Sequence, residues 1–228
     1  MIIHCTKKLA DKLKKHHPIS ATVLSAPDSD TSLGEWHANF ITVARRTMLL
    51  FIHNSTRFSF IVPEVKAADY KRLDELFHKG LLNTMQAMGY REELIYAAAE
   101  RHDPIQLDSK TDRSILGSLN QIGQGLEHTV WYDGYEAVIE DFWHHSARLC
   151  DRPTSTKGMK LGEALFPAKA MQAYLGFEPE KTVKDVMLDT VLSRVEQDFS
   201  RLEQGMLSAE ELEQHITNSP NVIPFKRP

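Results

Sequence analysis

The sequence predicts an α+β fold, in which a small antiparallel sheet packs with helices and is followed by a mostly helical C-terminal region. Two observations support this class. Three β-rich runs lie close together before residue 64 and are separated by short polar turns. After that point, apolar residues recur mainly with the spacing of amphipathic helices. The expected order of the first elements is β-α-β-β-β-α.

The first two elements are expected in the N-terminal 15 residues. Ile2 to Cys5 is an apolar run that predicts a strand, and Thr6 offers a side-chain oxygen to cap a helix over residues 7–15. Pro18 stops that helix, because the residue before a proline avoids helical backbone angles. The stretch 20–34 is rich in Ser, Thr, Asp and Pro and predicts a mobile loop.

Three strands are expected next, over residues 35–43, 47–53 and 57–63. The short polar turns between them favour an antiparallel meander. In the middle strand, Met48 to Ile52 is continuously apolar, which is typical of a strand covered on both faces. We therefore expect this strand at the centre of the sheet.

Most of the remaining chain is predicted to be helical. The segment 111–125 keeps apolar residues at helical spacing but contains three glycines, each of which weakens a helix by about 1 kcal/mol relative to alanine. Gly89 is well placed to end the helix expected over residues 66–88. Helices are expected over residues 66–88, 91–101, 111–125, 135–149, 161–175 and 182–206, with a short one after Ser208.

A polar, breaker-rich stretch at 151–160 predicts a boundary. The expected division is an α+β domain over 1–150 and a helical region over 151–228, whose helices offer a surface for homo-oligomerisation. Cys5 and Cys150 are too few for a disulfide scaffold and indicate free thiols in a reducing compartment. No signal-peptide pattern or membrane-spanning run is present, so a cytoplasmic, bacterial-type protein without membrane contact is expected.

The net charge of −4 argues against a nucleic-acid binder that relies on overall positive potential. Residues 1–90 hold 12 Lys+Arg and 8 Asp+Glu, a balance of +4, whereas residues 91–228 hold the other 15 and 23, a balance of −8. Either the two halves complement each other or the basic half meets an anionic ligand. Nucleic acid remains a weak alternative through Lys7, Lys8, Lys12, Arg45 and Arg46.

The sequence lacks the common catalytic and nucleotide-binding signatures: Walker A, G-x-G-x-x-G, G-x-S-x-G and H-E-x-x-H. No cofactor is therefore predicted. The expected helix over 135–149 aligns Glu136, Glu140 and His144 at i, i+4 and i+8. A metal site needs further ligands from elsewhere, so a solvated helix face is the preferred interpretation and no metal is predicted.

Four separated motifs follow one another along the chain: Thr-Lys-Lys-Leu at 6–9, Trp-x-Ala-Asn at 36–39, Arg-Arg at 45–46, and Arg-Ser-x-Leu-Gly-Ser-x-Asn at 113–120. With these motifs the chain resembles an uncharacterised bacterial family described only as a domain of unknown function. The resemblance runs from the N-terminus to residue 130 or so. It implies one N-terminal unit that includes the glycine-containing segment, and it implies no activity, substrate or catalytic residue.

The family pattern places a set of polar residues in that unit. Strand alternation puts His37 and Asn39 on one side of their strand, opposite Trp36. Adjacent arginines can hold a phosphate or a carboxylate through forked hydrogen bonds. The alternative is a purely structural role for these residues. Arg45 and Arg46 would then form an exposed turn, Trp36 would lie in the core, and Asn39 and Asn120 would hydrogen-bond to backbone groups. The candidate ligand-binding residues are His37, Asn39, Arg45, Arg46, Arg113, Ser114 and Asn120.

Three functions remain open. The preferred one is a binding module that recognises a partner protein or a phosphate-containing ligand, because catalytic signatures are missing and the charge is asymmetric. The second is an enzyme of unrecognised type with a pocket between the sheet and residues 111–125, in which Arg113 orients an anionic substrate and His37 or His4 acts as general base. The third is an accessory protein of a mobile-element or defence locus.

Overall fold

The computed structural model divides the chain into two compact units, residues 1–179 and 180–228. The helices expected after residue 181 lie outside the described residues except for four single positions, as does the middle of the expected loop at 20–34. The description below concerns the first unit. The structure describes residues 1–22, 24–25, 32–101, 103–154, 159–160 and 164–179, together with Ser193, Glu196, Gln197 and Ser200.

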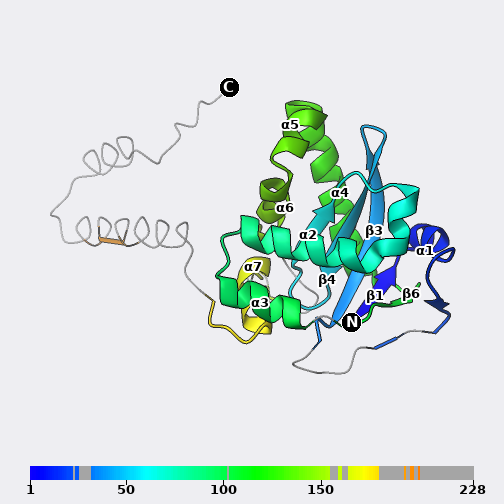
Figure 1. Cartoon of the computed structure of the whole chain (residues 1–228). Helices are drawn as coiled ribbons and strands as arrows, with labels where there is room; N and C mark the ends of the chain where they lie inside the picture. Colours follow the sequence, from blue (N-terminus) through cyan, green and yellow to red (C-terminus); the bar gives the residue numbers. More distant parts are fainter. Residues whose placement is uncertain are drawn as a thin grey trace. The chain divides into compact units, whose positions relative to one another are not determined.

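The first unit is an α/β structure with helices on both faces of a six-stranded sheet; in Figure 1, α2 crosses in front of the sheet and α4 runs behind it. The strand order is β2-β6-β1-β3-β4-β5. The strands are β1 (Ile2–Cys5), β2 (Ile19–Ser20), β3 (Glu35–Val43), β4 (Arg46–His53), β5 (Ser59–Val62) and β6 (Gln106–Asp108).

The predicted antiparallel sheet is correct for the meander β3-β4-β5 and wrong for the sheet as a whole, which is mixed. β1 pairs in parallel with β3 on one side and with β6 on the other, and β2 is parallel to β6. A strand that returns beside its predecessor after a long crossover runs parallel to it, and the long connections before β3 and β6 allow this return. β6 is three residues long and follows Pro104, so its sequence gives no alternating pattern that would predict a strand.

The helices follow the amphipathic pattern with changes at several ends: the helix predicted over 7–15 ends at Leu13, the one over 111–125 continues to Asp133, and the one over 161–175 begins at Pro167. The predicted helix over 66–88 begins as the 3-10 helix η1. It ends before Gly89, as predicted, and the φ of 73° at Gly89 is the left-handed conformation in which glycine commonly ends a helix. The predicted helix over 135–149 is broken at Asp141. The elements are α1 (Lys7–Leu13), η1 (Ala67–Arg72), α2 (Leu73–Ala87), α3 (Glu92–Glu100), α4 (Arg113–Asp133), α5 (Tyr135–Glu140), α6 (Phe142–Cys150) and α7 (Pro167–Tyr174).

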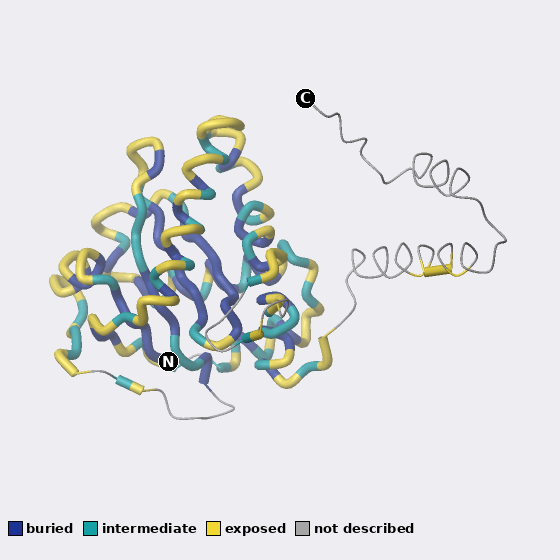
Figure 2. Tube along the Cα trace, turned by 180° about the vertical axis from the view of Figure 1, so that it is seen from behind, coloured by how far each residue is buried: buried dark blue, intermediate teal, exposed yellow. Residues whose placement is uncertain are grey.

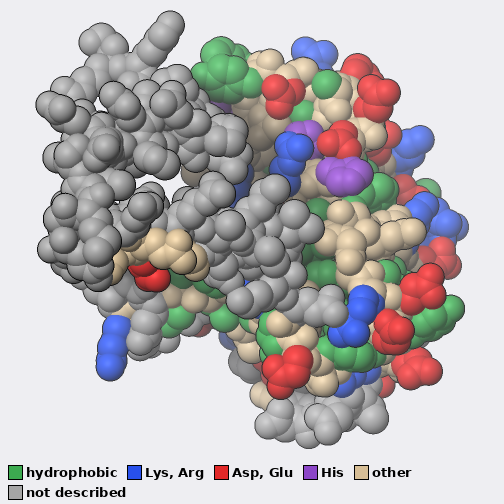
Figure 3. Space-filling model, turned by 90° about the vertical axis from the view of Figure 1, so that its left-hand side faces the viewer, with side chains coloured by type: hydrophobic (Ala, Val, Ile, Leu, Met, Phe, Trp, Pro, Cys, Tyr) green, Lys and Arg blue, Asp and Glu red, His purple; other side chains and the backbone are tan. Residues whose placement is uncertain are grey.

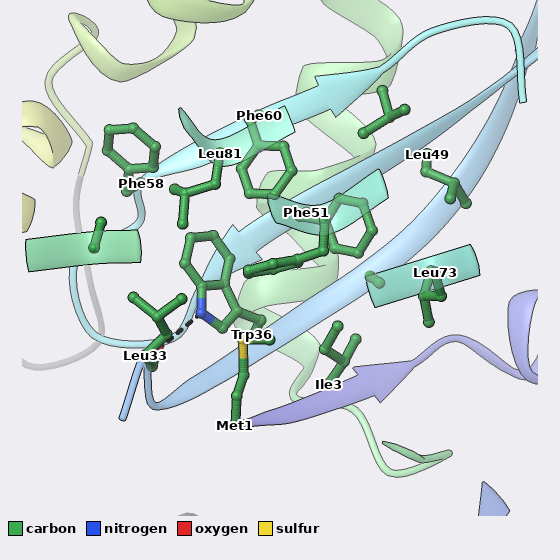
Figure 4. Packing of buried hydrophobic residues seen from close by; sticks show 14 of the residues in the cluster. Met1, Ile3, Leu33, Trp36, Leu49, Phe51, Phe58, Phe60, Leu73 and Leu81 are labelled. Carbon is green, nitrogen blue, oxygen red and sulfur yellow. Dashed lines mark hydrogen bonds between the residues drawn. The ribbon is translucent and has the colours of Figure 1, made fainter. Parts of the chain in front are cut away.

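An aromatic core fills the first face of the sheet, beneath α1, α2, α3 and α7. Trp36 packs edge-on against Phe60 and Phe77, with ring centroids 5.5 and 5.0 Å away. Its indole Nε1 donates to the Leu33 carbonyl oxygen at 2.8 Å, so the polar atom of this fully buried side chain is satisfied (Figure 4). Phe51 stacks on Phe60 at 4.9 Å and completes the group.

A second apolar cluster fills the opposite face, where α4, α5 and α6 cover β4. Met48, Leu50 and Ile52 point into it, whereas Leu49 and Phe51 point into the first core. Burial on both sides explains the continuous apolar run of β4, which is the middle strand of the meander but lies next to the edge strand β5 and not at the centre of the six-stranded sheet. Figure 2 shows the strands buried in the middle of the unit and the outward faces of the helices exposed.

Helix α6 protects the edge strand β5, whose outer backbone groups would otherwise lack partners. The Ser146 hydroxyl accepts from the Ile61 N–H at 3.2 Å. The Cys150 thiol accepts from the Ser59 N–H at 3.4 Å and donates to the Ser59 carbonyl at 3.0 Å.

Among the described residues, no helix is both long and apolar enough to cross a membrane.

Residues beyond 150 contribute to the first core. Met171 on α7 is fully buried in it, and Leu175 is nearly so. The Arg101 guanidinium at the end of α3 donates to the carbonyl oxygens of Tyr174 and Leu175, at 3.0 and 3.1 Å, and so caps the C-terminus of α7. The core therefore continues past the breaker-rich stretch at 151–160.

Candidate functional site

Three polar side chains lie side by side on the second face, across three parallel strands. His4 on β1 is in register with His37 on β3 and with Asp108 on β6. All three are nearly or fully buried, and the two imidazole centroids are 4.8 Å apart. Buried polar groups need partners, so their hydrogen bonds show what this cluster does.

His4 lies between two carboxylates. Its Nδ1 is 2.9 Å from Asp108 Oδ1, and its Nε2 is 3.3 Å from Glu35 Oε2. Asp108 also accepts from the backbone N–H groups of Leu24, at 2.8 Å, and Lys110, at 3.0 Å. The carboxylate of Asp108 therefore connects His4 on β1 with the backbone at Leu24 and at Lys110.

His37 is held as a single neutral tautomer. Its Nε2 accepts from the Asp112 backbone N–H at 2.8 Å, so its Nδ1 carries the proton and donates to Asn54 Oδ1 at 2.7 Å. Burial lowers the pKa of His37, with the neighbouring His4 acting in the same direction, which favours the neutral ring. Asn54 Nδ2 in turn donates to Glu35 Oε2 at 3.0 Å. The hydrogen bonds thus form one chain from Asp108 to the backbone of Asp112.

This buried network positions the start of α4. Asp112 is the N-cap, and its Oδ1 accepts from the N–H groups of Ser114 and Ile115 at 2.7 and 3.1 Å. These backbone hydrogen bonds, that of Ile115 first, lower the pKa of the Asp112 carboxyl. His37 therefore holds the residue that caps the longest helix of the unit. Both of its ring nitrogens are engaged within the protein.

The structure separates the other predicted site residues. Asn39 accepts from the Thr6 hydroxyl at 2.8 Å and from the Phe40 N–H at 2.9 Å, on the same face as His37. Arg45 and Arg46 lie at the turn between β3 and β4; Arg46 pairs with Val43, which is six residues beyond His37 on β3, about 20 Å away at 3.3 Å per residue. Both are exposed, and Arg46 Nε is 4.0 Å from Glu64 Oε1.

The predicted residues of α4 lie at the opposite end from that turn. Arg113 and Ser114 are exposed in its first turn, beside His37, and Asn120 is exposed about two turns later. The full helix is about 30 Å long. Arg113 therefore does not meet Arg45 and Arg46. Anion binding by these residues stays a prediction, and the three side chains do not lie around one position where an anion could bind.

An exposed aromatic group at the C-terminal end of α4 was missed by the sequence analysis. Trp131 is 75% exposed and Tyr132 is 71% exposed. Their ring centroids are 4.6 Å apart, and His128 stacks on Tyr132 at 5.4 Å. The signal was available, because these three positions fall on the side of the helix opposite the buried stripe of Ile115, Leu119 and Leu126.

The same region is acidic. Residues 114–147 contain no Lys or Arg. Asp141 bonds to His144 Nδ1 at 2.6 Å, while the other carboxylates form no ion pair with any described residue. We call His128, Trp131 and Tyr132, with their neighbours Glu127, Asp133 and Glu136, the aromatic acidic surface. The carboxylates of the whole stretch are Glu127, Asp133, Glu136, Glu140 and Asp141.

The helix considered for a metal has a different shape from the one expected. α5 ends at Glu140 and α6 begins at Phe142, so Glu136 and His144 do not share one continuous helix face. Within the described part of the chain, no group of three or more His, Cys, Asp or Glu side chains is arranged to hold a metal ion.

Comparison with known proteins places the chain in a family. No curated protein and no solved structure matches it. One family model does match, over residues 2–170, from β1 into α7, which confirms the predicted family resemblance and carries it beyond residue 130. The chain therefore belongs to the family described as Domain of unknown function (DUF6933).

Proposed function

We propose that this protein is a binding module that recognises a partner protein through the aromatic acidic surface. The observation that supports the proposal is the exposure of Trp131 and Tyr132 next to each other on helix α4. Tryptophan and tyrosine are among the residues that contribute most to binding energy when a partner buries them. The exposed faces of these two rings do not contribute to the packing of this unit.

The rings are also preorganised for binding. Trp131 meets Tyr132 at 83°, and His128 lies nearly parallel to Tyr132, at 26°. Side chains that already restrict one another lose less conformational entropy when a partner arrives. The buried network contributes indirectly, since it fixes the first turn of the helix that carries these rings.

The outward face of α4 extends the surface toward its N-terminus. Gly117, Asn120 and Gln124 are exposed there, and no charged side chain occurs between Arg113 and Glu127. A Cβ atom added at Gly117 would meet nothing within 4 Å. An uncharged helix face with room above it allows a partner to approach the backbone closely.

The other functions have less support. Arginines that lie at opposite ends of α4 do not form one phosphate site, and the Lys12 ammonium lies over the Phe40 ring at 4.6 Å. Figure 3 shows basic and acidic side chains interspersed on the face it presents. For an enzyme, His37 would need a free ring nitrogen, and both are bonded within the protein.

Quantitative affinity purification from the source cells tests the proposal. We expect Trp131→Ala/Tyr132→Ala to lose one or more partners that wild type retains, because the variant removes the anchoring rings. Tyr96→Ala is the matched control, since Tyr96 is 67% exposed on α3. Both variants should keep the wild-type circular dichroism and melting temperature. Identical partner sets for wild type and the double variant would contradict the proposal.

A further inference from the structure

We infer that the aromatic acidic surface binds a cationic segment of its partner protein, with Lys or Arg side chains lying over the rings of Trp131 and Tyr132. This inference rests on the proposed function and specifies the chemistry of the partner. It follows from three features of the surface: its carboxylates without an ion pair among the described residues, its position at a helix C-terminus, and the spacing of its rings and carboxylates.

Among the described residues, no Lys or Arg forms an ion pair with the carboxylates of this surface, although the guanidinium of Arg152 lies beside Gly125 of α4. The 34 residues from 114 to 147 carry five Asp and Glu and no Lys or Arg. At the neighbouring turn, Arg46 is engaged by Glu64, whose Oε1 also accepts from the Tyr135 hydroxyl at 3.1 Å. Glu127, Asp133 and Glu136 are exposed and form no ion pair with described residues. A cationic partner would complement this potential, whereas a nucleic acid would be repelled.

The position at a helix C-terminus adds to the negative potential. The last carbonyl groups of a helix carry partial negative charge, which is normally balanced by Lys, Arg or His in the last turn. The last turn of α4 contains no basic residue and instead ends on Asp133. This arrangement is unfavourable for the isolated helix. An arriving Lys or Arg would interact with both the carboxylate and the helix end.

The spacing of the side chains suits a guanidinium or ammonium group. Glu127 and Trp131 are four residues apart, so they lie on one side of α4. A cation over the indole face can pair with that carboxylate at the same time, combining a cation–π contact with an ion pair. Gly134, with φ of 83°, is the single residue between α4 and α5, and Glu136 lies in the first turn of α5.

Binding of a defined peptide to the full-length protein tests the inference. The probe is a fluorescently labelled 12-residue peptide of alternating Arg and Ala, and the comparison peptide alternates Glu and Ala. We expect the Arg peptide to bind, the Glu peptide not to bind, and added salt to weaken the complex. Trp131→Ala should weaken it by about 2- to 30-fold, the range typical of one cation–π contact.

The charge variant Glu127→Gln/Asp133→Asn/Glu136→Gln should weaken binding at least as much. Its matched control is Glu92→Gln/Glu93→Gln/Glu100→Gln, which removes three exposed carboxylates around the exposed Tyr96 on α3. Equal loss in the two triple variants would show general attraction to an acidic protein and overturn the inference. Self-association in analytical ultracentrifugation that disappears in Trp131→Ala would assign the surface to a second copy of the chain, and would overturn it as well.

The two proposals fail in different ways. If the cellular partner is lost in Trp131→Ala/Tyr132→Ala but kept in the charge variant, and the Arg peptide does not bind, the binding function stands and the cationic partner is wrong. If the double variant keeps every partner, the proposed function itself is wrong, whatever the peptide does.

Discussion

The histidines of this protein show how burial sets the behaviour of single residues. His53, at the end of β4, lies between Trp36 and Tyr174, with ring centroids 5.0 and 4.6 Å away. Burial, helped by the positive charge of Arg57, lowers its pKa from 6.5 to about 3. The pKa of His37 is lowered for the same main reason. Both rings are therefore neutral in the folded state, although they are on opposite faces of the sheet.

These shifts predict how stability depends on pH. A folded-state pKa below the unfolded value means that the unfolded chain binds the proton more readily, so the contribution of His53 is complete above pH 6.5 and declines as the pH falls toward 3. Each such histidine adds a slope of up to about 1.4 kcal/mol per pH unit. Urea unfolding at several pH values should show a shallower slope in His53→Gln than in wild type. Parallel slopes would contradict this prediction.

At the residue scale, alternation along β3 predicted that His37 and Asn39 share a face, and the structure confirms it. The bonding partners of these residues were not predictable. His4 and Asp108 are 104 residues apart in sequence, and nothing local to either indicates that they meet. The exposed pair Trp131 and Tyr132 could have been found by plotting α4 as a helical wheel.

Glycines inside helices illustrate the element scale, because the same residue serves different purposes in α2 and α4. A Cβ atom at Gly80 would lie 2.7 Å from Phe60 and 2.8 Å from Val62, so α2 can approach β5 only with glycine there. Gly123 has one close neighbour, Ile41, at 3.2 Å. Gly117 has open space, so the packing of the unit does not explain it.

Two alanine substitutions should therefore have opposite effects on stability. Gly117→Ala should raise the free energy of unfolding by about 1 kcal/mol, because alanine favours the helix and meets nothing. Gly80→Ala should lower it by about 1–3 kcal/mol, because the methyl group forces α2 away from β5. Urea denaturation of both variants measures the difference. A loss of stability in Gly117→Ala would show that its surroundings are more crowded than the structure indicates.

At the scale of the whole molecule, the question is where the folding unit ends. The family match reaches residue 170, and the compact unit reaches residue 179. Met171 and Leu175 complete the aromatic core, and Arg101 anchors the end of α7. The predicted boundary at residue 150 can therefore be tested directly by truncation.

We expect a chain ending at Pro179 to unfold cooperatively, because it keeps every element of the first unit. A chain ending at Cys150 should be less stable by several kcal/mol, since burying one large apolar side chain contributes about 1.5–3 kcal/mol and two such side chains, with their contacts, are removed. Thermal unfolding followed by circular dichroism distinguishes them. Equal melting temperatures would support independent folding of residues 1–150.

Local patterns in the sequence are enough to predict the three-stranded meander, most of the amphipathic helices and the family. The mixed sheet, the strand β6 and the separation of the predicted arginines became visible in the folded chain alone. The physical reason is the range of the interactions. Helical and strand periodicity depends on residues a few positions apart, whereas parallel pairing of β1 with β3 and β6 joins segments separated by long connections. Which polar side chains meet, such as His4 and Asp108, depends on that pairing.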